Sequence, residues 1–273
     1  MNVKGLLLFF EDTLRIERYA MRSSRIHRLD ARVKLLLSLA VVVTAVTVRS
    51  LLSLVFLAAL IAVLAAVSRV PTRYFLLRSA LIPTFSLIMG LPFLFIIPGA
   101  RAFALSLGDI VLAATWQGAE RLAFFVVRVW VCVASVFLLG LTTRFAAVLE
   151  AMRRLGVPRL FVDTLMMTYR YLFLFVEEAY RLVVAREART LLPEGRLRFF
   201  RSLGGVLGAL FIRAYERGER VYLAMASRGY PSLQAPRHER SWHTPEVVIL
   251  AAVFLYCLSI WVAEFLRYGG FMD

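Results

Sequence analysis

The sequence contains few of the residues from which enzymes and metal sites are usually built. It holds three histidines and two cysteines among 273 residues, and its only lysines are Lys4 and Lys34. Each of these lysines follows a valine. The phosphate-binding loop of an ATPase needs a Gly-Lys-Ser/Thr ending, in which backbone amides and the lysine hold the phosphates. The sequence therefore excludes ATP hydrolysis of this kind by this chain.

Ligands for a metal ion and groups for hydrolysis are equally scarce. His27, His238 and His243 lie outside every apolar run, and no cysteine is near the last two. No histidine lies near a serine of the apolar runs, and these runs contain no pair of aspartates that could do acid–base chemistry. We therefore expect no metal site, no cofactor and no catalytic residue. A membrane-embedded enzyme or an assembly factor is the alternative of another class.

Acidic charge is low as well. The chain has 18 acidic against 33 basic residues, a net charge of +15, and charged residues make up only 19% of it while hydrophobic residues make up 60%. Soluble domains carry about 25% charged residues, so an ordinary soluble domain is excluded. Strong positive charge suits either nucleic acid or an anionic membrane surface. Here the basic residues stand among aliphatic and aromatic ones, which favours the lipid bilayer as partner and argues against nucleic acid.

Long apolar runs are what the sequence has in abundance. A hydrocarbon core of about 30 Å requires about 20 helical residues, and five runs reach or approach this length. Only Arg49 and Ser50 separate the first two, which predicts a tight helical hairpin. The sequence thus predicts an all-α integral membrane protein with about five transmembrane helices plus long amphipathic cytoplasmic coupling helices. The runs are Val33–Val48, Leu51–Val67, Ser79–Ile97, Leu122–Leu141 and Val247–Leu266.

Basic residues indicate the orientation, because positively charged short loops stay in the cytoplasm. They crowd the N-terminal tail and the connection around Arg73, whereas the connection after Pro98 has few. We expect a multi-pass protein of the plasma or inner membrane, with a cytoplasmic N-terminus and an outer C-terminus. Residues 1–32 are then an amphipathic cytoplasmic segment and 33–141 a four-helix transmembrane region. Residues 142–240 are the coupling-helix region, and 241–273 the final transmembrane helix with its outer end.

Glycine and proline divide the coupling region into three predicted helices, Arg144–Leu155, Pro158–Thr190 and Arg196–Arg228. Both long helices are amphipathic. In the third, Gly204 and Gly208 form a small-xxx-small pair that would let the other long helix cross at close backbone distance. Glycines merely tolerated in a membrane-associated helix are an equally weighted alternative.

The two long helices end alike, in Ala188-Arg189-Thr190 and in Ser227-Arg228-Gly229. An arginine at a helix C-terminus ordinarily complements the helix dipole and bonds the last carbonyls, which contributes about 0.3–1 kcal/mol. Its repetition at two helix tips favours a second hypothesis. In this hypothesis, the rigid guanidinium groups reach acidic groups of a separate protein.

Several segments together resemble the transmembrane T component of energy-coupling factor (ECF) transporters, in particular the cobalt/nickel-type CbiQ family. The similarity covers nearly the whole chain, and its specificity lies in the combination of segments. They are His27-Arg28-Leu29-Asp30-Ala31-Arg32-Val33-Lys34-Leu35, Leu155-Gly156-Val157-Pro158, Thr168-Tyr169-Arg170-Tyr171-Leu172-Phe173, Glu177-Glu178-Ala179, Arg186-Glu187-Ala188-Arg189 and the stretch from Glu219 to Tyr230.

The resemblance implies a non-catalytic scaffold of an ABC-type importer. In this family, Ala-Arg-Gly-like triplets at the two helix tips dock into two ATPase subunits, which bind the ATP. Arg189 and Arg228 take the central position, although Thr190 replaces a glycine and Ser227 an alanine, and Arg186 could share the first contact. A membrane-embedded, metal-binding substrate subunit is the other implied partner. Cobalt or nickel uptake is the expected pathway, and a scaffold for a vitamin or for several substrate subunits is the alternative.

Arg128 is the charge in the middle of the fourth apolar run, and an intramembrane charge is a functional hypothesis by default. We favour a structural role over a part in the conformational mechanism. Pairing with Glu264 requires that the two residues lie at the same depth.

The charge distribution predicts which residues a membrane-impermeant thiol reagent reaches from each side. Cysteines introduced near Arg73 and Pro193 should react only from the cytoplasm, and cysteines at Gly99 and Asp273 only from outside, because the basic loops stay inside. Labelling of Asp273→Cys only from the cytoplasm would contradict the five-span topology and require an even number of crossings.

Overall fold

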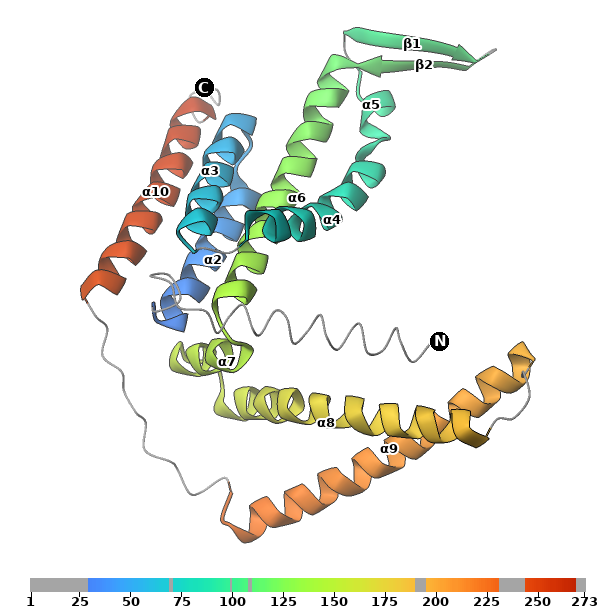
Figure 1. Cartoon of the computed structure of the whole chain (residues 1–273). Coiled ribbons are helices and arrows are strands. Elements are labelled where there is room, and N and C mark those ends of the chain that lie inside the picture. Colours follow the sequence, from blue (N-terminus) through green and yellow to red (C-terminus); the bar gives the residue numbers. More distant parts are fainter. Residues whose placement is uncertain are drawn as a thin grey trace. The chain divides into compact units, whose positions relative to one another are not determined.

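The computed structural model describes residues 29–68, 71–98, 100–107, 110–189, 195–230 and 244–268. Thr190 and all but the end of the predicted N-terminal segment lie outside these residues. The chain divides into two compact units, one of residues 15–155 and 242–273, the other of residues 1–14 and 156–241. We call the first the membrane unit and the second the coupling unit, and describe each by itself (Figure 1).

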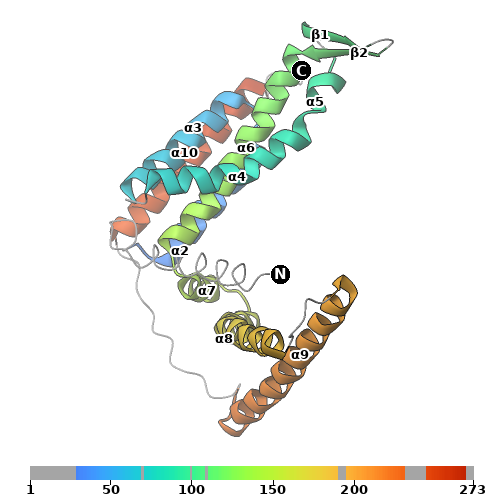
Figure 2. The same cartoon turned by 45° about the vertical axis from the view of Figure 1, so that its right-hand side comes forward.

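The membrane unit is a bundle of helices. Helix α6 contacts α2, α3 and α4, and α10 packs against α2 (Figures 1 and 2). The expected all-α architecture is confirmed, and so is the break at Arg49–Ser50. The elements are α2 (Ala31–Thr47), α3 (Leu51–Val67), α4 (Thr72–Gly90), α5 (Phe93–Ile96), β1 (Arg101–Leu107), β2 (Ile110–Thr115), α6 (Trp116–Thr142), α7 (Phe145–Arg154) and α10 (Thr244–Tyr268).

Three stretches among the described residues are long and apolar enough to cross a membrane: Arg73–Ile96, Trp116–Thr142 and Glu246–Leu266. Helix α3 is apolar but shorter, and α2 has 17 residues. The protein is therefore an integral membrane protein. The count of five crossings stays a prediction, because the two shorter helices fall below the length that spans a hydrocarbon core unaided.

A small hairpin is the element that the sequence analysis does not anticipate. Strands β1 and β2 pair antiparallel in the connection between α5 and α6. Thr115 ends β2 and caps α6, because its side chain accepts a hydrogen bond of 3.2 Å from the Gly118 amide. A Cβ atom at Gly118 would lie 2.5 Å from the Phe93 carbonyl oxygen, so glycine permits the close approach of α5 to α6.

Polar contacts join the ends of α2, α6 and α10 at one end of the bundle. Asp30 caps α2 by accepting from the Arg32 amide at 2.9 Å, and it pairs with the Arg32 guanidinium at 3.1 Å. The Asp30 amide donates to Glu246 Oε1 of α10 at 3.1 Å, and Lys34 Nζ donates to the carbonyl of Thr142, the last residue of α6, at 3.0 Å. These contacts fix where the three helices begin and end relative to one another.

The turn between α2 and α3 is held by two charges from other helices. Arg128 of α6 donates to the Val48 carbonyl, while Glu264 of α10 accepts from the Arg49 amide. Both backbone groups belong to the same peptide unit. The Ser50 amide also donates to Glu264 Oε1, at 2.6 Å.

This geometry decides how the intramembrane arginine is partnered. Arg128 and Glu264 reach the same peptide unit, so the condition of equal depth is met. They are linked through the 48–49 peptide, whose carbonyl faces the cation and whose N–H faces the anion. The guanidinium also lies 4.4 Å from the centre of the Phe124 ring. Each charge thereby meets the opposite end of the same peptide dipole.

We expect Arg128→Met and Glu264→Leu each to destabilise the protein by about 3–5 kcal/mol, because each leaves one charge without its counterpart. The double variant should lose less than the sum of the two, since neither charge then remains, with a coupling energy of about 0.5–3 kcal/mol. Reversible unfolding in mixed micelles measures these free energies.

Arg121→Met is the control, because Arg121 lies on α6 and is exposed. Glu264→Gln should cost less than Glu264→Leu, since the amide oxygen still accepts from the two backbone N–H groups. Strictly additive losses in the double variant would contradict the peptide-bridged pair.

Candidate docking site on the coupling helices

The coupling unit contains two long helices, α8 (Arg159–Arg189, 31 residues) and α9 (Arg196–Ser227, 32 residues). At 1.5 Å per residue each is about 46–48 Å long. Their side chains are largely exposed, and Val162 is the fully buried residue of α8 among those described.

Three side-chain contacts tie α8 to α9. Glu178 pairs with Arg213 near the middle. Arg186 of α8 lies 4.6 Å from the ring centre of Phe199 and donates to the Ser202 hydroxyl. At the other end of α8, the Asp163 side chain contacts Tyr230, which follows the end of α9. From one contact to the next, the residue number rises on α8 while it falls on α9. The two helices therefore run antiparallel.

The last of these contacts is a hydrogen bond of 3.3 Å from the Tyr230 hydroxyl to Asp163 Oδ2. The same carboxylate pairs with Arg159 at 3.3 Å. Desolvation, and then the neighbouring Asp163 carboxylate, raise the pKa of the Tyr230 phenol above its ordinary value. The phenol thus stays protonated and donates.

Arg189 and Arg228 lie at opposite ends of this antiparallel pair, because each ends its own helix. Both side chains are exposed, as are those of Ala188 and Ser227. Toward the residues that the structure describes, neither guanidinium has a hydrogen bond or an ion pair. The sequence-predicted tips are therefore separate surfaces about one helix length apart.

Backbone groups, not arginine, cap the end of α9. Gly229 has a φ of 77°, its amide donates to the Ala226 carbonyl at 3.0 Å, and the Tyr230 amide donates to the Met225 carbonyl at 3.0 Å. This is the Schellman pattern. The Ser227 hydroxyl donates to the Ala224 carbonyl at 3.1 Å. Three of the last carbonyls are thus satisfied without Arg228, so this arginine is not needed to bond them.

The sequence comparisons agree with this architecture. The family described as cobalt transport protein, CbiQ, matches residues 22–242. The chain belongs to this family. Its relatives include an uncharacterized protein of Methanocaldococcus jannaschii, 29% identical over 84% of this chain and 79% of the relative.

Two further CbiQ-family relatives have informative names. A cobalt transport protein CbiQ of Rhodobacter capsulatus is 29% identical over 60% of this chain and 62% of its own length. The energy-coupling factor transporter transmembrane protein EcfT of Thermosediminibacter oceani is 28% identical over 79% of this chain and 83% of the relative. The family description and the names of these relatives agree with the resemblance found in the sequence.

Arg186 has a different place from the two tip arginines in this CbiQ-family chain. The resemblance allows it to share the first docking contact, but its guanidinium lies between α8 and α9, against Phe199 and Ser202. Sequence reasoning missed this role, since nothing local separates an arginine that packs between two helices from one that projects.

Gly204 and Gly208 lie on an open face of α9. A Cβ atom at either position would meet no atom within 4 Å among the described residues. The contacts between α8 and α9 therefore do not use these glycines. The expected crossing of the two long helices at this pair is therefore not found among the described residues.

No group of three or more His, Cys, Asp or Glu side chains capable of holding a metal ion occurs in the described parts of the chain. His238 and His243 lie outside them.

Sequence reasoning also missed Glu178, Arg213 and Tyr230 as contacts between the helices. A Gly-Tyr pair directly after an amphipathic helix is the signal that indicates a Schellman cap.

Two glycine substitutions in α9 should have opposite effects. Gly229→Ala should destabilise the α9 tip by about 1–2 kcal/mol, because an L-residue resists positive φ. Gly218→Ala, at a mid-helix site with no atom within 4 Å, should stabilise the helix by about 0.5–1 kcal/mol. Hydrogen exchange of residues 223–230 measures both effects. Equal exchange in the two variants would contradict the capping role of Gly229.

Proposed function

We propose that this chain is the non-catalytic coupling subunit of an ECF-type importer, which carries the motion of two ATPase subunits to a membrane-embedded substrate-binding subunit. The observation that carries the proposal is the pair of exposed arginines, Arg189 and Arg228, at opposite ends of the α8–α9 pair. At the end of α9, helix capping does not account for the arginine, because backbone amides satisfy the carbonyls.

The separation of the two tips favours two partner molecules. Helix α8 has 31 residues and is thus about 46 Å long, whereas a small domain is about 30 Å across. One ATPase domain of that size cannot cover both tips. Two ATPase subunits can cover both tips, one at each. The planar guanidinium groups of the two arginines suit bidentate hydrogen bonds to carboxylates.

The three ties between α8 and α9 support a mechanical role. Contacts at both ends and near the middle make the pair a braced element rather than two independent helices. A displacement of one tip is then passed along the pair, since rigid secondary elements transmit coupling between distant sites.

Cobalt is the substrate that the family description and the name of the Rhodobacter capsulatus relative favour, with nickel as the alternative. We propose that the metal is bound by the substrate-binding subunit and ATP by the ATPase subunits, so that this chain needs no cofactor. The same proposal places the N-terminus in the cytoplasm and the C-terminus outside, in accordance with the basic loops.

Charge reversal at the tips tests the proposal. We expect Arg189→Glu and Arg228→Glu to insert normally but to lose association with the ATPase subunits by about 30-fold or more, because removing one partner of a closed ion pair costs about 2–5 kcal/mol. The double variant should be most severe, and Arg→Lys should be partly tolerated. Copurification of ATPase subunits and metal uptake by cells are the measurements.

Arg217→Glu is the control, because Arg217 lies on α9 four residues after Arg213, which pairs with Glu178 near the middle, and eleven residues before Arg228. It should leave copurification and uptake close to wild type. Normal ATPase binding and uptake in the double tip variant would contradict the docking assignment. Copurifying partners identified by mass spectrometry would separate a dedicated metal importer from a scaffold shared among several substrate subunits.

A further inference from the structure

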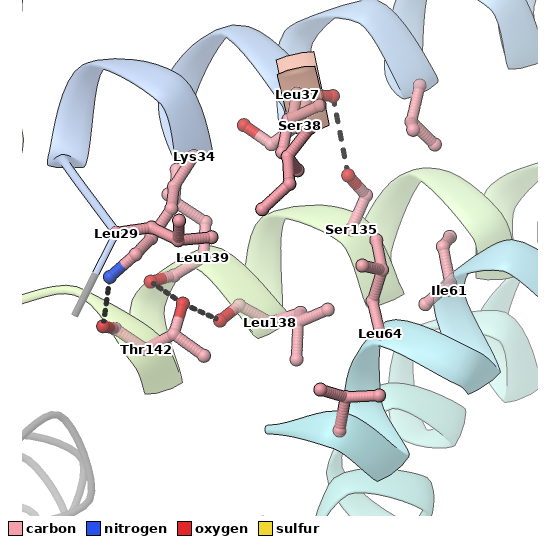
Figure 3. A pocket seen from close by; sticks show the side chains of 13 residues that line it. Leu29, Lys34, Leu37, Ser38, Ile61, Leu64, Ser135, Leu138, Leu139 and Thr142 are labelled. Carbon is pink, nitrogen blue, oxygen red and sulfur yellow. Dashed lines mark hydrogen bonds between the residues drawn. The ribbon is translucent and has the colours of Figure 1, made fainter. Parts of the chain in front are cut away.

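A cavity of about 320 Å³ lies in the membrane unit between α2, α3, α6 and α10. Its walls are almost entirely aliphatic (Figure 3). The charged lining residue is Lys34, and the ammonium group lies at one end of the cavity, against the Thr142 carbonyl. Cavities of 300 Å³ and above hold small molecules in many proteins.

Water does not fit the chemistry of these walls. A buried water needs 2–4 polar partners, and the hydroxyls here already bond to backbone carbonyls. Ser135 donates to the Ser38 carbonyl at 3.3 Å, Ser38 to Leu35 at 2.9 Å and Thr142 to Leu138 at 2.8 Å. An unfilled cavity would lose the dispersion contacts of its lining. A hydrocarbon chain in the cavity would make these dispersion contacts with the aliphatic side chains.

The Lys34 ammonium lies at the level of the lipid headgroups, as the length of α6 shows. Helix α6 has 27 residues, about 40 Å, which exceeds a hydrocarbon core of about 30 Å. Its last residue, Thr142, therefore reaches the headgroup layer, and the Lys34 ammonium bonded to it lies at the same level. From Thr142 to Ser135 the cavity wall runs about 10 Å along α6 toward the membrane interior.

We propose that this cavity binds one acyl chain of an anionic phospholipid, with the phosphate beside Lys34. The carboxylates at this end are Asp30, which pairs with Arg32 at 3.1 Å, and Glu246, which accepts from the Asp30 amide at 3.1 Å. Basic pockets between membrane helices bind acidic headgroups in this way. The site is independent of the metal pathway and of ATPase docking.

Val67→Trp fills the mouth of the cavity and tests the acyl-chain site. Val67 lines the cavity and is 48% exposed, so the core need not repack around the indole. Val63→Trp is the matched control, one turn earlier on α3, 59% exposed and outside the cavity lining. The full chain is reconstituted in vesicles of phosphatidylglycerol and phosphatidylcholine, extracted gently and analysed by native mass spectrometry.

We expect wild type and Val63→Trp to retain one phosphatidylglycerol, and Val67→Trp to lose it. Lys34→Met should lower the preference for phosphatidylglycerol over phosphatidylcholine about five-fold, the effect of one basic residue near a membrane surface. Arg144→Met, which removes an exposed charge outside the lining, should keep the preference. Equal retention in the two tryptophan variants would overturn the proposal. So would retention of phosphatidylcholine in its bilayer proportion, or of added palmitate in place of phospholipid.

Discussion

The peptide unit between Val48 and Arg49 is the point on which the membrane bundle depends. Its carbonyl accepts from Arg128 of α6 and its N–H donates to Glu264 of α10, so one peptide unit gives two charged side chains a hydrogen-bond partner. In a medium without water, charged side chains must find such partners within the protein. The turn between α2 and α3 is therefore fixed to α6 and α10 at a definite depth.

A second polar layer closes the opposite end of the same bundle. Glu246 accepts from the Asp30 amide, and Lys34 donates to the Thr142 carbonyl. Between the two layers lies an apolar core that includes Leu54, Leu57 and Val131. Apolar contacts are non-directional, and lipid tails compete for them, so they set no unique register between membrane helices. The polar layers supply that register.

Arginine serves three purposes in this chain, and the surroundings decide which. Arg128 is partnered by a peptide group and an aromatic ring inside the bundle. Arg186 joins α8 to α9 through Phe199 and Ser202. Arg228 ends a helix whose carbonyls are satisfied by backbone amides, which leaves an exposed guanidinium suited to contact another protein. The end of α9 is thus capped by its own backbone, and the Arg228 side chain stays exposed.

Local properties of the sequence were enough to predict most of the helices. Hydropathy and the Arg49–Ser50 break predict α2 and α3, and glycine and proline place α9 within one residue of its observed end at Ser227. Both signals depend on the residues of one segment, because helix formation, capping and membrane insertion are determined over a few turns. The β1–β2 hairpin was missed although the sequence carries a signal for it, because two short apolar runs flank Gly108-Asp109, a two-residue pair typical of hairpin turns.

The sequence alone also determined that the chain is a membrane protein of basic character with two arginine-ended helices. Only the tertiary structure decided which arginine is bridged to Glu264, which one packs between helices and which one is exposed at a helix end. Arg128 and Glu264 stand far apart in sequence, on α6 and α10, and meet only because both reach the turn after α2. A residue's type fixes the bonds that it can make, but the bonds that it does make depend on which distant groups folding brings within 3 Å.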